Sequence, residues 1–135
     1  MFLGTYRVRF SAAGRIVLPR KLRGELKNAQ EIILTRGFDG GVWGFDKEEW
    51  ERQALLQLEI PITEKKGRDI RRLLFSAAEA VELDKQGRFV IPESLLAQGN
   101  LKTEVCLIGA GDHFEAWDVN EWERVANKGF DSTQG

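Results

Sequence analysis

Cysteine and histidine are almost absent from this chain. Among its 135 residues there is one cysteine, Cys106, and one histidine, His113. A single cysteine excludes a disulfide bond within the chain, and one cysteine with one histidine cannot form a Cys/His metal cluster. Cys106 lies in the apolar run 105–108, so we expect it to be a small core residue. No metal and no other cofactor is expected.

Long apolar runs and catalytic motifs are missing as well. No stretch approaches the roughly 20 apolar residues that a transmembrane helix needs. Residues 1–7 contain no signal-peptide core, so we expect a soluble cytosolic protein. The sequence shows no glycine-rich phosphate loop and no nucleophile–base pair, and His113 has no serine or cysteine motif to work with. An enzyme is therefore the least favoured class.

Net charge is also small, at −1, which alone predicts no polyanionic partner. The charge is unevenly distributed, however. Residues 1–30 hold seven basic groups against one acidic group (net +6), and residues 64–72 hold five against two (net +3). Residues 84–124 hold four against eight (net −4). This asymmetry indicates that one face meets an anion, and a solvated charged surface remains the alternative.

What the chain does contain is a stretch that occurs twice. Residues 10–19 read FSAAGRIVLP and residues 83–92 read LDKQGRFVIP. In both, an apolar residue leads into a tight turn that ends in Gly-Arg, and a short apolar strand closed by proline follows. A second pair of patches, at 46–52 and 118–124, ends in Glu-Trp-Glu-Arg both times. The offset is 73 at the turns (88 − 15) and 72 at the tryptophans (122 − 50), which indicates a duplication.

The first copy has a readable order of elements. Alternation over residues 5–10 predicts a strand whose outer face carries Arg7 and Arg9. After the turn at 11–14 we expect a return strand at 15–18, a helix at 20–26, strands at 31–35 and 42–45, and a helix capped by Asp46. The second copy repeats this order, and Thr63 is expected to cap a helix between the copies. The predicted organisation is a first repeat at 1–58, a helical connector at 59–77, a second repeat at 78–127 and a flexible tail at 128–135.

Each Gly-Arg turn projects an arginine from a strand. A guanidinium group is a planar fork of donors that fits a phosphate, or a guanine in the major groove, in bidentate fashion. Asp84 stands four residues before Arg88, so these two side chains either form a structural pair across the turn or leave Arg88 to bind a ligand. Ser11 stands at the matching position of the first copy, so we expect Arg15 to be the freer arginine.

The doubled turn, the Met-Phe-Leu-Gly start at 1–4 and the repeated Glu-Trp-Glu-Arg helix resemble the MraZ family of AbrB-like (swapped-hairpin) transcription factors, over residues 1–125. The resemblance implies an α+β fold in which two tandem AbrB-like half-repeats form one pseudo-twofold β-barrel-like core with flanking helices. It also implies a ring-shaped homo-oligomer, commonly of eight or twelve subunits. The family binds short direct repeats in double-stranded promoter DNA, typically of the division and cell-wall gene cluster.

Carried over residue by residue, the DNA-contacting arginine of the family's turn falls on Arg15 and, in the second copy, on Arg88. The basic start of the short helix at 20–23 resembles the one that AbrB-type domains use. Together with the basic face of the first strand, these give the expected DNA-binding set: Arg15, Arg88, Arg7, Arg9, Arg20, Lys21 and Arg23. The family usually keeps an acid in both turns, so Ser11 is a departure that makes the first turn less rigid.

The leading hypothesis is a sequence-specific DNA-binding transcriptional regulator, cytoplasmic and nucleoid-associated, with no membrane or small-molecule partner. The alternative is an AbrB-like antitoxin or protein-interaction scaffold. Antitoxins of that kind usually add a disordered partner-binding tail of tens of residues, whereas only about eight residues follow the expected last helix here.

Overall fold

The structure, a computed structural model, describes the backbone of residues 1–134 and the side chains of residues 1–128. The first copy contains β1 (Thr5–Arg9), β2 (Arg15–Val17), α1 (Arg20–Arg23), β3 (Glu31–Arg36), β4 (Val42–Asp46) and α2 (Lys47–Leu58). After α3 (Lys65–Ser76), the second copy contains β5 (Glu79–Glu82), β6 (Arg88–Val90), α4 (Glu93–Gly99), β7 (Glu104–Gly109), β8 (Phe114–Asp118) and α5 (Val119–Gln134). The expected α+β class and the repeated order of elements are confirmed.

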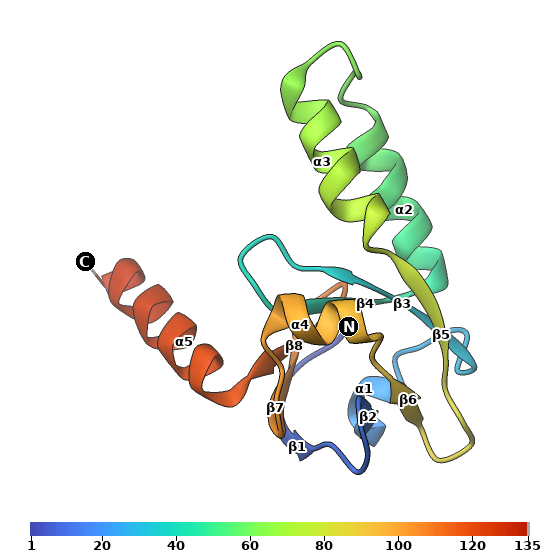
Figure 1. Cartoon of the computed structure of the whole chain (residues 1–135), viewed down its shortest axis with the longest axis vertical. Helices are drawn as coiled ribbons and strands as arrows, with labels where there is room; N and C mark the ends of the chain where they lie inside the picture. The colour runs from blue at the N-terminus through green and yellow to red at the C-terminus, as the bar shows by residue number, and fades with distance from the viewer. Residues whose placement is uncertain (135) are drawn as a thin grey trace.

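The strands form a six-stranded antiparallel sheet in the order β1-β7-β8-β4-β3-β5 and a separate two-stranded ribbon of β2 and β6 (Figure 1). Exchanging every strand for its counterpart in the other copy reproduces the same sheet order, so an approximate twofold axis passes between β4 and β8. The register agrees with this axis. Trp43 pairs with Glu115 and Ile16 with Phe89, at offsets of 72 (115 − 43) and 73 (89 − 16). The spatial duplication thus has the same offsets as the sequence duplication.

Strand pairing corrects one expectation. The strand after each turn does not return beside the strand before it, because β1 pairs with β7 and β2 pairs with β6, both in the other copy. β5 likewise pairs with β3. Backbone groups around the turns are also satisfied by the other copy: Leu18 N–H donates to Gly87 O, and Ile91 N–H donates to Gly14 O, each at 2.8 Å. The two copies therefore complete each other instead of forming two separate hairpin units.

The expected β-barrel-like closure is also absent from the described part of the chain. Within residues 1–134 the large sheet ends at β1 on one side and at β5 on the other. The ribbon lies against the core instead, where Phe89 of β6 packs edge-on to Phe114 of β8 with ring centroids 6.5 Å apart. The ribbon strands are three residues long each and, among the described strands, pair only with each other.

Matching residues of the two copies fill the core. Leu18 and Leu22 correspond to Ile91 and Leu95 at an offset of 73, and all four are at most 1% exposed. Burying one such side chain contributes about 1.5–3 kcal/mol relative to leaving it in water. This packing fixes α1 although the helix has only four residues and ends at Arg23, earlier than the expected end at residue 26. The ribbon and the short helices that follow it are therefore held rigidly.

α2 and α3 form a helical hairpin that stands away from the sheet (Figure 1). Asp46 caps α2 as expected and accepts a hydrogen bond from Glu48 N–H at 3.3 Å. The expected cap at Thr63 is wrong, because α3 begins at Lys65 and no side chain caps it. The loop is held instead by Arg71, whose guanidinium group donates to the carbonyl of Ile60 at 2.9 Å.

The last helix differs from the expectation in length. Asp118 lies at its start as expected, and its side chain accepts a hydrogen bond from Glu121 N–H at 3.4 Å. α5 continues to Gln134, so the helical backbone extends beyond the expected end at 127. Residue 135 lies outside the described residues, and flexibility of segment 128–135 stays a prediction.

Candidate nucleic-acid interface

The β2–β6 ribbon has a buried face and an exposed face. Ile16 and Phe89 lie opposite each other at its centre and are 1% and 2% exposed. Strand alternation turns the remaining four side chains outward: Arg15, Val17, Arg88 and Val90. Arg15 lies opposite Val90, and Val17 lies opposite Arg88. The outward face of the ribbon therefore presents two arginines on one diagonal and two valines on the other.

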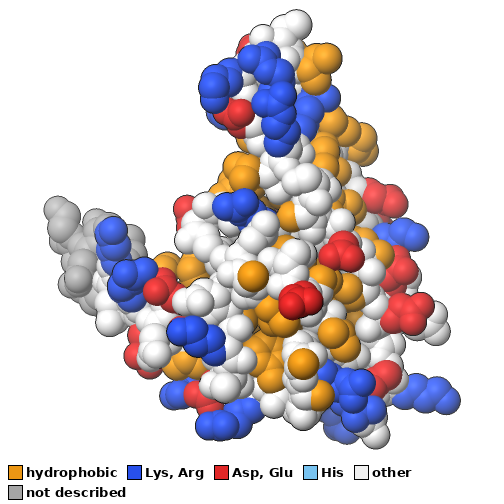
Figure 2. Space-filling model, viewed as in Figure 1, with side chains coloured by type: hydrophobic (Ala, Val, Ile, Leu, Met, Phe, Trp, Pro, Cys, Tyr) orange, Lys and Arg blue, Asp and Glu red, His pale blue; other side chains and the backbone are white. Residues whose placement is uncertain are grey.

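The ribbon lies at the opposite end of the molecule from the α2–α3 hairpin (Figure 1). Figure 2 shows Lys and Arg side chains gathered at this lower end, where β1, β2 and β6 lie, and a second group over the far end of α3. The second group matches the basic segment 64–72. The basic residues are thus concentrated at two ends of the molecule, as the uneven charge of the sequence predicts.

Arg15 projects from the first turn without an ionic partner. The turn is closed by backbone bonds from Ser11 N–H to Arg15 O at 2.9 Å and from Arg15 N–H to Ala12 O at 3.1 Å. The Ser11 hydroxyl donates only to Arg15 O, at 3.4 Å. Within residues 1–128, no carboxylate lies within ion-pair distance of the Arg15 guanidinium group. The expectation that Arg15 is the freer arginine agrees with this geometry.

Arg88 projects from the second turn and is held by Asp84. Asp84 Oδ2 accepts from Arg88 Nε at 2.7 Å, while Oδ1 accepts from the backbone N–H groups of Arg88 and Gln86 at 2.9 Å. The backbone hydrogen bond from Arg88 and then its side-chain hydrogen bond lower the pKa of the Asp84 carboxyl. Asp84 and Arg88 thus form the structural pair that the sequence left open, and Asp84 engages the guanidinium group of Arg88 through Nε.

Different side chains cover the two turns. Gly14 and Gly87 both have a positive φ, of +74° and +80°. A Cβ atom at Gly87 would lie 2.1 Å from Nη1 of Arg23, whereas one at Gly14 would lie 2.9 Å from Ile91 O and 3.2 Å from Leu96 Cδ1. Arg23 and Leu96 are counterparts at an offset of 73 (96 − 23). A guanidinium group therefore covers the second turn where an apolar side chain covers the first.

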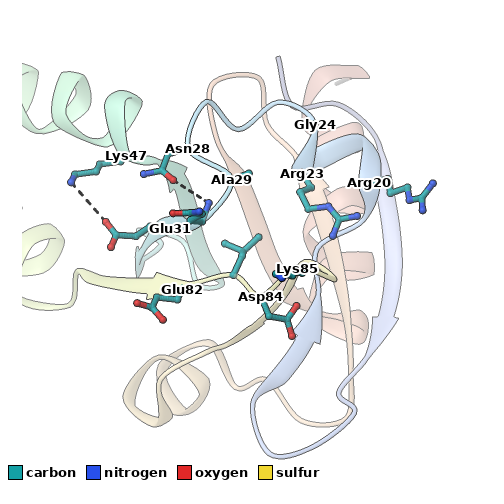
Figure 3. Close-up of a pocket in the computed structure, with 12 residues that line it drawn as sticks. Arg20, Arg23, Gly24, Asn28, Ala29, Glu31, Lys47, Glu82, Asp84 and Lys85 are labelled. Carbon is teal, nitrogen blue, oxygen red and sulfur yellow. Dashed lines mark hydrogen bonds and ion pairs between the residues drawn. The ribbon is translucent and has the colours of Figure 1, made fainter.

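An open hollow of about 970 Å³ lies beside the second turn, between α1 and the loop at 28–31 (Figure 3). Its charged lining residues are mixed in sign: Arg20, Arg23, Lys47, Lys85, Glu31, Glu82 and Asp84. Lys47 lies 3.9 Å from Glu31, and Asp84 binds Arg88. In Figure 3, Arg23 and Lys85 lie near Asp84. Arg23 and Lys85 thus extend the basic surface next to Arg88.

Lys85 is a basic residue that the sequence analysis missed. It lies in the second turn, and its counterpart in the first turn is Ala12 at an offset of 73 (85 − 12). The second copy is acidic as a whole, so the overall charge of this segment does not indicate a basic residue in its turn. Aligning the two turns residue by residue would have found it.

Arg7 and Arg9 lie on the outer face of β1 and both reach Glu104 of the neighbouring strand β7. Arg7 donates to Glu104 Oε1 from Nε at 3.0 Å, and Arg9 Nε lies 3.5 Å from Glu104 Oε2. The hydrogen bond to Glu104, together with its charge, raises the pKa of Arg7. These two arginines are therefore partly neutralised, unlike Arg15.

Lys21 and Arg20 are exposed on α1 and line a second open hollow, of about 510 Å³, with Tyr6 and Glu25. The structure thus brings Arg20, Arg23 and Arg88 to the surroundings of the second turn. It places Arg7 and Arg9 on the edge strand β1 instead.

A second cluster of charged residues lies around His113, which precedes β8. His113 Nδ1 lies 2.8 Å from Asp112 Oδ1 and its Nε2 lies 2.7 Å from Glu115 Oε2. The ring stacks on Phe45 of the first copy, with centroids 5.2 Å apart. Burial works to lower the pKa of His113, but the hydrogen bonds to Glu115 and Asp112 outweigh it, so the pKa is raised. This cluster fastens the β7–β8 loop to the first copy.

Among the residues that the structure describes, no group of three or more His, Cys, Asp and Glu side chains could hold a metal ion. None of the described helices combines the length and the apolar character that crossing a membrane requires. Cys106 is buried, as expected of a core residue.

The fold and the ribbon define a class of duplicated α+β proteins in which strands of the two half-repeats pair with each other and together present one β-ribbon that carries two arginines. The chain belongs to the MraZ family: the family model described as "MraZ protein, putative antitoxin-like" matches residues 1–73 and again residues 74–134. The "Transcriptional regulator MraZ" of Ligilactobacillus salivarius (strain UCC118) is 37% identical over 128 residues, which cover 95% of this chain and 88% of that protein. The "Transcriptional regulator MraZ" of Paenarthrobacter aurescens (strain TC1) is 41% identical over 128 residues, which again cover 95% of this chain and 88% of that protein.

Proposed function

We propose that this protein is a transcriptional regulator that binds double-stranded DNA in a sequence-specific manner through the outward face of the β2–β6 ribbon. The observation that carries the proposal is the pair of exposed arginines, Arg15 and Arg88, on a two-stranded ribbon with a fully buried inner face. The names of the two relatives support the regulatory role.

The dimensions of the ribbon suit the major groove. That groove admits a two-stranded β-ribbon, and several DNA-binding proteins read base edges with one. An arginine makes a bidentate contact with O6 and N7 of guanine, which contributes about 1–3 kcal/mol of discrimination against the wrong base. Arg23, Lys85, Arg20 and Lys21 would then lie beside the ribbon, where basic side chains commonly contact phosphates and fix the register.

A ring of eight or twelve subunits on short direct repeats, in the promoter of a division and cell-wall gene cluster, is the finer part of the proposal. One ribbon makes few contacts, and each additional subunit that binds the same DNA does so at high effective concentration. Direct repeats suit cyclic symmetry, because neighbouring subunits point the same way. The cytoplasmic, nucleoid-associated location follows from this role.

The α2–α3 hairpin offers support for self-association. In an isolated subunit it exposes five large apolar side chains: Leu55 (66% exposed), Leu56 (45%), Leu58 (43%), Ile62 (59%) and Leu73 (38%). Apolar patches of this kind commonly mark protein–protein contacts. The basic residues of α3 and the acidic segment 84–124 are complementary in charge, which fits a contact between different faces of two copies.

The test is an electrophoretic mobility shift on the DNA upstream of the protein's own gene, measured at several salt concentrations. We expect specific binding that weakens steeply as salt rises, because phosphate contacts release counterions. Size-exclusion chromatography with mass measurement tests the ring. A lasting monomer that binds no duplex would overturn the proposal.

A second candidate is a partner-binding antitoxin or scaffold, since the matched family is described as antitoxin-like. It predicts a stable complex with another protein that is unaffected by Arg15→Ala. The DNA-binding proposal predicts loss of DNA affinity in the same variant, so one substitution separates the two candidates.

A further inference from the structure

Two valines share the outward face of the ribbon with the two arginines. Val17 and Val90 are 42% and 48% exposed, although valine is most often buried. Single exposed apolar residues are common and need no function by themselves. These two differ because each lies directly across the ribbon from an arginine: Val90 from Arg15, and Val17 from Arg88.

We propose that Val17 and Val90 contact the 5-methyl groups of thymine, and that the ribbon thereby selects sites in which thymine lies next to the guanines that Arg15 and Arg88 bind. This inference rests on the proposed function and deepens it. It assigns to the valines a base preference that the arginines cannot supply.

The chemistry favours thymine. In the major groove, thymine alone presents a methyl group, and small apolar side chains are the residues that contact it. Valine presents two methyl groups and is stiff about χ1, so it loses little rotamer freedom on binding. Ile16 and Phe89 hold the same two strands in the core, which fixes the outward side chains in place before DNA arrives.

The spacing also fits. Residues on the same face of one strand are separated by about 6.8 Å, twice the rise of roughly 3.4 Å per residue. Directly opposite residues on paired strands have Cβ atoms about 5 Å apart. Base pairs are stacked about 3.4 Å apart along the duplex. With the ribbon aligned along the major groove, each valine would lie one or two base steps from the base that an arginine reaches, either on its own strand or across the ribbon.

The experiment uses the full chain and a DNA site selected from a random pool. Each thymine of the site is replaced in turn by deoxyuridine, which removes only the methyl group, and affinity is measured by fluorescence anisotropy. We expect about fourfold weaker binding at each contacted thymine, the effect of losing one buried methyl-sized group. These positions should lie within two base steps of a guanine whose recognition is lost in Arg15→Ala or Arg88→Ala. Deoxyuridine outside the site is the control.

A double variant, Val17→Ala with Val90→Ala, completes the test. It should bind the thymine and deoxyuridine sites equally, since the contact has been removed from the protein side. Leu3→Ala, which alters an exposed apolar residue outside the ribbon, should keep the full sensitivity. If the double variant fails to fold, the single variant Val90→Thr, which retains one methyl group, should show a reduced deoxyuridine effect.

The outcomes separate this inference from the proposed function. Tight binding that is indifferent to deoxyuridine at every position would overturn the thymine contact and leave the DNA-binding proposal standing. Equal deoxyuridine sensitivity in the wild type and the double variant would also overturn it, because the effect would then belong to the DNA. Absence of binding to any selected duplex would overturn the proposed function itself.

Discussion

The two Gly-Arg turns share a backbone and differ in their surroundings. Both glycines have φ near +75 to +80°, and both arginines leave three-residue strands of the same ribbon. The Asp84 side chain accepts three hydrogen bonds, two from Arg88 and one from Gln86 N–H, whereas the Ser11 side chain makes a single weak contact at 3.4 Å. Duplication thus preserved the main-chain geometry while the side chains of the two copies diverged.

This difference gives the arginines different properties. Arg88 is oriented in advance, but the Asp84 carboxylate offsets its charge for an approaching polyanion. Arg15 keeps its full charge, since no carboxylate of residues 1–128 pairs with it. If both arginines bind DNA as proposed, Arg15 meets the polyanion with its full charge and Arg88 with its charge offset by Asp84, so we expect Arg15 to contribute more to affinity.

The largest expected effect is a loss of DNA affinity that is greater for a change at Arg15 than for a change at Arg88. Arg15→Ala should weaken DNA binding by about 10- to 100-fold per contacted site, the equivalent of one lost bidentate contact, and Arg88→Ala should have a smaller effect. Fluorescence anisotropy gives the affinities, and the oligomer mass and melting temperature should match the wild type in both variants. An Arg88→Ala loss equal to that of Arg15→Ala would show that the two turns read DNA equally.

The next effect concerns stability. Gly14→Ala and Gly87→Ala each force alanine into the left-handed region, at a cost of about 1–2 kcal/mol. At Gly14 the new Cβ also meets the carbonyl oxygen of Ile91, at 2.9 Å, while at Gly87 it meets the movable end of Arg23. Denaturant unfolding should therefore show a larger loss for Gly14→Ala. Equal losses of unfolding free energy would mean that the Arg23 side chain is held as firmly as the main-chain carbonyl group of Ile91.

A smaller effect comes from exchanging the turn residues. Ser11→Asp should place a carboxylate beside Arg15 and weaken DNA binding at low salt, and Asp84→Ser should strengthen it by freeing the charge of Arg88. The slope of log affinity against log salt concentration should fall with Ser11→Asp and rise with Asp84→Ser, by up to about one unit each. Slopes that do not change in either variant would show that the turn charges are remote from phosphate.

The smallest effect is the pH dependence of the His113 cluster. The first copy has Gly41 at the matching position, at an offset of 72 (113 − 41), so only the second copy carries this group. Because the pKa of His113 is raised in the folded state, its stabilising contribution is full below its unfolded pKa and is lost as pH rises through the folded value. His113→Asn should therefore lower the melting temperature more at about pH 5.5 than at about pH 8.5. A loss that is independent of pH would assign the role of His113 to packing on Phe45 alone.

Local chemistry explains what could be predicted from the sequence. Gly14 and Gly87 mark the turns because they adopt a positive φ, and alternation marks β1. The Asp84–Arg88 pair was foreseen as one of two alternatives because the residues are only four positions apart. Each of these features depends on neighbours within a few residues.

Features that join distant segments could not be foreseen. Glu104 neutralises Arg7 from 97 positions away, and Arg23 covers a glycine in the other copy. The cross-copy pairing of β2 with β6 was missed for the same reason, since the sequence pattern of a three-residue strand is too short to identify the strand that it pairs with.

The amino-acid sequence by itself determined the duplication, the two turns, the family and the freedom of Arg15 from a local carboxylate. Only the tertiary structure decided that the arginines share one ribbon, because strand partners are chosen by which apolar side chains bury together. Ile16 and Phe89 meet in the common core, and that contact turns Arg15 and Arg88 to the same outer face.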